Sequence, residues 1–222
     1  MLKTRDLVVE YPDGTRAVDT LNFFLREGEN VALIGANGAG KTSLLLSLAG
    51  VLPPAGGDIY MGMTLFEESS MREIRSQIGI TFQNPDDQFF MPTVYEDVAV
   101  GARNPENVSA TLSKLGIDHV ARRPARELSD GDKRLAAIAT VLIMEPEFIL
   151  LDEPTAYLDP RARRNLIYTL MDLPQGMLIA THDTALASIL CNRVLLMENG
   201  RLVADEGTEL LHDKEKLEAA GL

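Results

Sequence analysis

The sequence predicts an α/β protein built on a mixed, largely parallel sheet. Two short apolar runs, at residues 31–34 and 148–152, have the composition of buried parallel strands. The first run leads through a glycine-rich turn into a leucine-rich helix at 41–49, and the second ends in the adjacent carboxylates Asp152 and Glu153. Open α/β sheets carry their ligand chemistry at the carboxyl ends of the strands. We therefore expect the functional site at this edge of the sheet.

The elements before and after this core follow from turn signals. Residues 2–30 have strand composition and are divided by the turn Pro12-Asp13-Gly14, which predicts an antiparallel β layer at the N-terminus. Asn199-Gly200 predicts a hairpin between two strands near the C-terminus. We expect a charged helix from Thr208 onward.

Between the two halves of the core lies a segment with helical composition. Residues 84–127 are polar and helix-rich, and an apolar helix is expected over 133–144. These residues predict a helical subdomain at approximately 84–147, inserted into a single domain that covers residues 1–222.

Composition excludes several classes of protein. The 21 basic and 33 acidic residues give a formal net charge of −12, which argues against a nucleic-acid-binding surface. No apolar stretch reaches the ~18 residues that span a bilayer, and no signal peptide opens the chain. Cys191 is the only cysteine, which rules out an internal disulfide and fits a reducing cytosol.

The segment G-A-N-G-A-G-K-T at 35–42 matches the phosphate-binding pattern G-x-x-x-x-G-K-[ST]. Its glycines let backbone N–H groups turn toward phosphate oxygens, and the N-terminus of the following helix attracts anions. Lys41 is expected to reach the β- and γ-phosphates, and the Thr42 hydroxyl and Asp152 to hold Mg²⁺. Glu153 is then placed to orient or deprotonate an attacking water. The chain is expected to bind a nucleoside triphosphate.

Other motifs resemble those of ABC-type ATPases. L-S-D-G-D at 128–132 resembles the L-S-G-G-Q signature, and Gln83 after an apolar strand resembles the glutamine of the Q-loop. Asp159 in A-Y-L-D resembles the D-loop aspartate, His182 in T-H-D the switch histidine, and Tyr11 the aromatic residue that stacks on adenine. These elements occur in the family's order and cover essentially the whole chain.

The resemblance implies a set of site residues. Glu153 and His182 would be catalytic, Ser129 and Gly131 would act on the nucleotide of a second chain, and Gln83 would join the Mg²⁺ site. The expected ATP-binding residues are Tyr11, Gly35, Asn37, Gly38, Ala39, Gly40, Lys41, Thr42, Ser43 and Gln83. The expected Mg²⁺ ligands are Thr42, Gln83 and Asp152.

Some of these residues also have plain structural interpretations. Tyr11 is compatible with an ordinary aromatic residue at the end of a strand, and His182 with a structural histidine. In the signature, Asp130 and Asp132 replace a glycine and a glutamine, and two carboxylates would repel a phosphate. Alternatively Ser129 and Asp132 form a capping box that opens the next helix, with Asp130 pointing away. We expect a working but slow ATPase.

The segment Q-N-P-D-D-Q-F-F-M-P-T-V-Y-E-D-V-A at 83–99 closely resembles energy-coupling factor ATPases. The resemblance implies contacts between this segment and a membrane-embedded coupling subunit, against the alternative of a solvated acidic turn. The expected interface residues are Asp86, Asp87, Gln88, Phe89 and Phe90.

The resemblance therefore implies an ATP-hydrolysing importer subunit. It would act as a homodimer on the cytoplasmic face of the membrane, with a coupling subunit and a substrate-capture subunit as partners. The short tail favours a Co²⁺ or Ni²⁺ system, with biotin next. An exporter ATPase, a soluble ABC protein of DNA repair or the ribosome, and a non-hydrolysing nucleotide switch are the alternatives.

Overall fold

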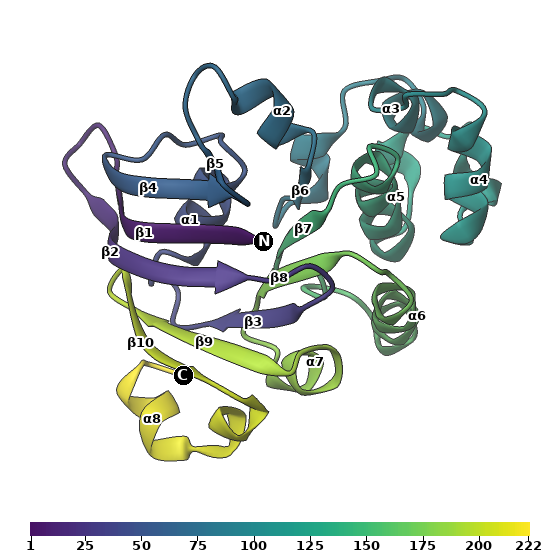
Figure 1. The fold of residues 1–222 in the computed structure, drawn as a ribbon. Helices are drawn as coiled ribbons and strands as arrows, with labels where there is room; N and C mark the ends of the chain where they lie inside the picture. Colours follow the sequence, from purple (N-terminus) through teal and green to yellow (C-terminus); the bar gives the residue numbers. More distant parts are fainter.

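The computed structural model describes residues 1–222 and contains two β-sheets with helices around them (Figure 1). The smaller sheet is antiparallel and has the strand order β2-β1-β4-β5. Its strands are β1 (Leu2–Glu10), β2 (Arg16–Leu25), β4 (Gly56–Met61) and β5 (Thr64–Leu65). The expected N-terminal antiparallel layer is present, and β4 and β5 extend it with residues from beyond the phosphate-loop helix.

The larger sheet is mixed and has the strand order β10-β9-β3-β8-β7-β6. Neighbours from β6 to β9 run parallel, and only β10 pairs antiparallel, through the expected Asn199-Gly200 hairpin. Its strands are β3 (Asn30–Ile34), β6 (Ile78–Thr81), β7 (Phe148–Asp152), β8 (Gly176–Ala180), β9 (Arg193–Glu198) and β10 (Arg201–Glu206).

All regular structure between residues 85 and 142 is helical, as the composition of this segment predicts. Figure 1 shows α3, α4 and α5 gathered beyond β6 and β7, on the side away from the antiparallel sheet. The α-helices are α1 (Lys41–Leu48), α2 (Met71–Arg75), α3 (Val94–Val100), α4 (Asn107–Lys114), α5 (Asp130–Leu142), α6 (Pro160–Met171), α7 (Thr184–Leu190) and α8 (Lys214–Ala219). Short 3₁₀ turns are Pro85–Gln88, Asp118–Val120, Ala125–Glu127 and Thr208–His212.

Alternate residues of the central strands belong to two different hydrophobic cores. In β7, Ile149 and Leu151 join a cluster of 33 buried residues with the helices α3–α7, whereas Phe148 and Leu150 join a cluster of 24. The second cluster contains the leucines of α1 and the inward side chains of the antiparallel sheet. Because successive strand residues point to opposite faces, the parallel sheet is covered on both sides. This burial fixes the carboxyl ends of β3, β7 and β8 next to one another.

Two expected boundaries were wrong. The helix expected over 133–144 begins at Asp130 and ends at Leu142, because Ser129 caps it and the acidic residues form its first turn. The tail expected as one helix from Thr208 begins as a 3₁₀ turn, and α8 starts only at Lys214. None of the helices combines the length and the apolar character needed to cross a membrane.

Candidate nucleotide-hydrolysis site

The loop between β3 and α1 is held in place by its own lysine. The Lys41 ammonium donates hydrogen bonds to the carbonyl oxygens of Gly35, at 2.6 Å, and Ala36, at 3.0 Å. Burial lowers the pKa of Lys41, while the nearby carboxylates of Glu153 and Asp152 oppose that shift. The Lys41 ammonium is therefore held inside the loop by two carbonyl groups, and phosphate oxygens would take the place of those carbonyls as its partners.

At two positions of the loop, the packing of neighbouring strands leaves room only for glycine, in addition to the space that a phosphate needs. Gly35 and Gly40 both have positive φ, and a Cβ atom at Gly40 would overlap the carbonyl oxygen of Ala17. At Gly35 a Cβ atom would overlap the carbonyl oxygen of Met197 in β9. The loop is thus pressed against the strands on both sides, which fixes the direction of its N–H groups.

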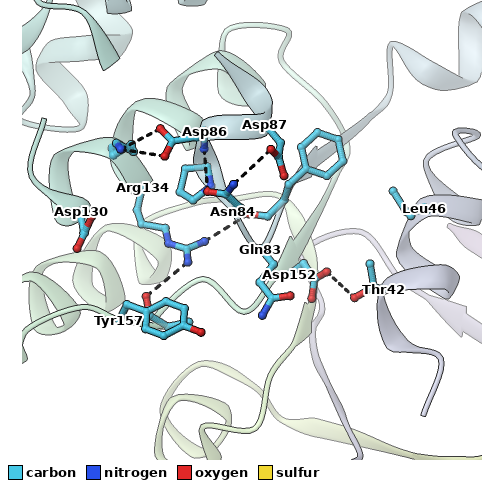
Figure 2. Close-up of a pocket in the computed structure, with 14 residues that line it drawn as sticks. Thr42, Leu46, Gln83, Asn84, Asp86, Asp87, Asp130, Arg134, Asp152 and Tyr157 are labelled. Atoms are coloured by element: carbon cyan, nitrogen blue, oxygen red, sulfur yellow. Dashed lines mark hydrogen bonds and ion pairs between the residues drawn. The ribbon is translucent and has the colours of Figure 1, made fainter. Parts of the chain in front are cut away.

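The expected metal ligands meet beside this loop. The Thr42 hydroxyl donates a 2.7 Å hydrogen bond to Asp152 Oδ2, and Gln83 lines the same cavity (Figure 2). Burial raises the pKa of Asp152, while the hydrogen bond from Thr42 lowers it. Mg²⁺ prefers oxygen ligands and needs only one or two carboxylates when substrate phosphates complete its shell. The hydroxyl, amide and carboxylate oxygens of Thr42, Gln83 and Asp152 fit that requirement.

Glu153 lies one residue beyond β7 and is oriented by two residues that follow β8. His182 Nδ1 lies 2.9 Å from Glu153 Oε1, and the Thr181 hydroxyl donates to Glu153 Oε2 at 3.3 Å. The Glu153 backbone has φ 46°, an uncommon conformation for a glutamate, and its N–H donates to the carbonyl of Ala180. Its carboxylate is only 8% exposed, whereas the His182 side chain is 65% exposed. The two side chains that the sequence interpretation expects to be catalytic therefore lie in contact at this edge of the sheet.

A further set of contacts surrounds Asp183, the residue next to His182, and the sequence interpretation missed it. Asp183 caps α7 by accepting from the N–H of Leu186 and forms a two-pronged ion pair with Arg163 of α6 at 2.8 and 2.9 Å. The Thr155 hydroxyl also donates to Asp183. Burial acts to raise the pKa of Asp183, but the Leu186 and Arg163 hydrogen bonds together lower it. The loops after β7 and β8 are thereby tied together.

The expected nucleotide-binding residues surround one cavity of about 940 Å³. The Tyr11 hydroxyl shares a 3.0 Å hydrogen bond with the Ser43 hydroxyl, and His182 and Glu153 line the same cavity. The predicted residues that line this cavity are Tyr11, Gly35, Asn37, Gly38, Gly40, Lys41, Thr42, Ser43, Gln83, Asp152, Glu153 and His182. Ala39 is buried and packs into the core beneath the loop.

The signature residues do not reach this cavity. Ser129 caps α5 by accepting from the N–H of Asp132, and its hydroxyl donates to the Asp132 carboxylate at 2.7 Å. This is half of the predicted capping box, in which the carboxylate would instead accept from the Ser129 backbone N–H. His119 lies 3.6 Å from the same carboxylate. Gly131 packs so closely on Ala162 of α6 that a Cβ atom would lie 2.9 Å from the alanine Cβ. Nothing in this chain's own site is contacted by Ser129 or Gly131.

The two unusual carboxylates of the signature face different surroundings. Asp130 lines a cavity of about 570 Å³ together with Arg134 and Gln83 (Figure 2). The same cavity is lined by Thr42 and Asp152 of this chain. Asp132 is held by Ser129 and His119. The D-loop residue Asp159 caps α6, and hydrogen bonds from the N–H groups of Ala162 and Arg161 lower its pKa.

The residues expected to contact a membrane partner differ in exposure. Asp86 pairs with Lys133 at 2.8 Å, and the Gln88 amide donates to α5 at Ala137 O and Thr140 Oγ1. Phe89 packs against the helical core, whereas Phe90 is 70% exposed. Phe89 follows the 3₁₀ turn and is partly buried, so Phe90 offers the larger exposed apolar surface of the two. Phe90 and the acidic residues are the exposed part of the segment.

Comparison with known proteins identifies the family. Residues 18–156 match the family model described as ABC transporter, and a protein of Geobacter sulfurreducens named as an ABC transporter ATP-binding protein is 42% identical, with 98% of this chain and 90% of the relative covered. The chain belongs to the ABC transporter ATP-binding family. It is an ATPase of the ABC type.

Other relatives lie within the subgroup that segment 83–99 predicts. The energy-coupling factor transporter ATP-binding protein EcfA of Methanothermobacter thermautotrophicus is 40% identical, covering 100% of this ABC ATPase and 76% of the relative. Among solved structures, CbiO1 of Clostridium perfringens, part of the ABC transporter complex CbiONQ, superimposes with a TM-score of 0.84 at 33% identity and covers 97% of this chain and 91% of its own. A dimeric bacterial ABC transporter cassette, MJ0796, gives a TM-score of 0.83 at 25% identity, with 94% and 99% covered.

Proposed function

We propose that this ABC ATPase is the ATP-hydrolysing subunit of an energy-coupling factor importer that takes up Co²⁺ or Ni²⁺ through membrane partner subunits. The site geometry supports the hydrolytic half of the proposal. The carboxylate of Glu153, oriented by His182 and Thr181, opens onto the same cavity as Lys41 and Thr42. The similarity to EcfA and CbiO1 supports the importer half.

Binding begins with the adenine and phosphate groups. Tyr11 lines the cavity, and its ring provides a face for the adenine. The loop N–H groups and the Lys41 ammonium bind the phosphate oxygens, and Lys41 gives up its bonds to Gly35 and Ala36 as it does so. Thr42, Gln83 and Asp152 are the residues that would hold Mg²⁺, which neutralises charge on the β- and γ-phosphates when bound.

Hydrolysis then requires a water held in line with the γ-phosphate. Glu153 accepts the proton of that water as its oxygen bonds to the γ-phosphorus and the bond to the β-phosphate oxygen breaks, leaving ADP and phosphate. His182 fixes one oxygen of Glu153 and Thr181 the other, so the carboxylate cannot rotate freely.

The signature residues complete the site from a second copy. Ser129 and Gly131 lie outside the cavity of their own chain, so they are free to contact a γ-phosphate bound by a partner. The functional unit is then a homodimer with two composite sites, each chain being one domain with a helical subdomain at about 84–147. Segment 86–90 meets the coupling subunit on the cytoplasmic face of the membrane, and Phe90 supplies the exposed apolar contact.

Affinity purification of this chain from detergent-solubilised native membranes tests the proposal. We expect a polytopic coupling subunit and a small substrate-capture protein to be recovered with it. Uptake of radioactive cobalt or nickel by the recovered complex in vesicles would support the metal importer. Uptake of biotin without uptake of either metal would show that the importer carries a vitamin and not Co²⁺ or Ni²⁺. Recovery of soluble partners alone would contradict a role in transport.

A further inference from the structure

The residue Arg134 is a buried cation that the hydrolysis mechanism does not use. It lies in the second turn of α5 and is only 6% exposed, yet no carboxylate lies within ion-pair distance of it. Burial lowers the pKa of Arg134, and the more distant carboxylates of Asp130, Asp152 and Glu153 oppose that shift. A buried charge without a direct ion-pair partner costs free energy, so its hydrogen-bond partners are informative.

Those partners are two backbone carbonyls from different loops. The guanidinium donates to the carbonyl of Phe82 at 3.3 Å and to the carbonyl of Ala156 at 3.4 Å (Figure 2). The first peptide unit leads directly into Gln83, and the second into Tyr157. Arg134 therefore joins the loop that carries the expected Mg²⁺ ligand Gln83 to the loop that follows Glu153.

The second loop has a conformation that such a contact helps to hold. Tyr157 has φ 64° and is 86% exposed, a costly backbone conformation for an aromatic residue. The carbonyl bonded by Arg134 belongs to the residue immediately before it. The planar guanidinium can hold two carbonyls at once, which a single point charge does less well.

The same helix carries the signature. Ser129 caps α5, and Gly131 packs on Ala162 of α6, so the N-terminal end of α5 is tightly connected to the helix that follows the Tyr157 loop. Arg134 is only one turn further along α5. Movement of Gln83 or Tyr157 in one site is thus connected through a rigid helix to the residues offered to the other site.

We infer that Arg134 is a positioning residue that links the nucleotide state of its own chain's site to the signature residues acting on the partner's nucleotide. The inference rests on the proposed homodimer with composite sites. Its consequence is cooperativity: occupation of one site sets the position of Ser129 and Gly131 for the other. Loss of the guanidinium should uncouple the two sites without removing any group that touches ATP.

The test compares Arg134→Met with Arg134→Lys and with Lys133→Met in the full chain. Lys133 is the adjacent cation on α5, but it pairs with Asp86 and bonds neither loop. For each variant we would measure the ATP dependence of hydrolysis, the affinity for a fluorescent ATP analogue, and the melting temperature.

We expect the wild type and Lys133→Met to show a Hill coefficient above 1. Arg134→Met should bind the analogue within about twofold of wild type, with the Hill coefficient reduced to about 1 and kcat lowered roughly tenfold. Arg134→Lys should be intermediate, because an ammonium keeps the charge but not the paired donors. This partial rescue, at equal melting temperature, separates positioning from loss of structure.

Cooperative hydrolysis at the wild-type rate in Arg134→Met would overturn the inference while leaving the proposed function intact. Equal losses of ATP affinity, kcat and melting temperature in both Arg134 variants would also overturn it, since a purely structural role predicts that pattern. A wild-type chain that hydrolyses ATP without cooperativity and without dimerising would contradict the proposed function itself.

Discussion

His182 Nδ1 lies 2.9 Å from Glu153 Oε1, although the two residues are 29 positions apart in the sequence. The contact arises because β7 and β8 are parallel neighbours, with Asp152 paired to Ala180, so that the residues just after both strands emerge together. The imidazole contacts the nearly buried carboxylate of Glu153, a residue whose backbone has an uncommon positive φ. In the proposed function, this pair is the part of the site that distinguishes hydrolysis from nucleotide binding alone.

Replacement of His182 by Ala should therefore lower turnover more than binding. We expect kcat to fall about 10²-fold, the lower end of what a positioned acid–base group contributes, with ATP affinity changed less than about threefold. Steady-state hydrolysis and equilibrium binding of a labelled nucleotide measure the two effects. An equal loss in both would mean that His182 mainly binds ATP.

The signature departs from the family pattern at Asp132, whose carboxylate holds the Ser129 hydroxyl at 2.7 Å. Asp132→Gln should weaken that hydrogen bond, because a neutral amide oxygen accepts less strongly than a carboxylate, and should remove a negative charge from the surface offered to the partner's phosphate. A repulsion of about 1 kcal/mol corresponds to roughly fivefold faster hydrolysis.

The matched control for this substitution is Asp118→Asn. Asp118 is an exposed acid on the neighbouring 3₁₀ turn that bonds Ser113 instead of the signature. We expect the ATPase rate of Asp132→Gln to rise above that of the wild type and the rate of Asp118→Asn to stay at the wild-type value. Unchanged or slower hydrolysis by Asp132→Gln would contradict the idea that the charge of Asp132 slows hydrolysis.

Asp183 gives a prediction about pH. Its pKa in the folded protein lies below the ordinary value of 3.8, so the folded state binds the proton less readily than the unfolded state. Its contribution to stability is therefore complete above about pH 4 and is lost as the pH falls through the folded pKa. Asp183→Asn keeps the helix cap but removes the charge opposite Arg163.

We expect this variant to lower the free energy of unfolding by about 1–2 kcal/mol near neutral pH. Urea denaturation at several pH values should show the difference from wild type shrinking below about pH 4. A difference that is the same at every pH would mean that the ion pair contributes nothing and that the substitution acts through packing.

Phe90 tests the partner surface. Phe90→Ser should remove the exposed apolar contact and reduce recovery of the membrane coupling subunit in affinity purification by about tenfold. Tyr168→Ser is the control, because Tyr168 is 64% exposed on α6, away from segment 86–90. Equal recovery with both variants would place the partner surface elsewhere.

Much of the site could be predicted from the sequence because its parts are local. The phosphate loop needs only a strand, a glycine-rich turn and a helix in succession, and the capping box at Ser129 spans four residues. Glu153 was predictable because it directly follows an apolar strand, and His182 because T-H-D after the next strand resembles the switch motif of the family.

The remaining contacts depend on how elements pack. The ion pair of Arg163 with Asp183 requires α6 and α7 to lie side by side, and Arg134 bonds carbonyl groups that carry no sequence signal. Phe89 turns inward from a 3₁₀ segment too short to show periodicity. The expected bounds of 133–144 left out the first turn of α5, although the helix cap predicted at Ser129 already indicated an earlier start.

The most direct test of the account is the mass of Glu153→Gln in solution with and without ATP and Mg²⁺, measured by light scattering during size-exclusion chromatography. We predict a shift from the 24.3 kDa monomer to a dimer on ATP addition, with hydrolysis abolished. Lys41→Ala, which lacks the phosphate-binding cation, should remain monomeric under the same conditions. A Glu153→Gln chain that stays monomeric with ATP bound, or that hydrolyses ATP at the wild-type rate, would contradict the composite site.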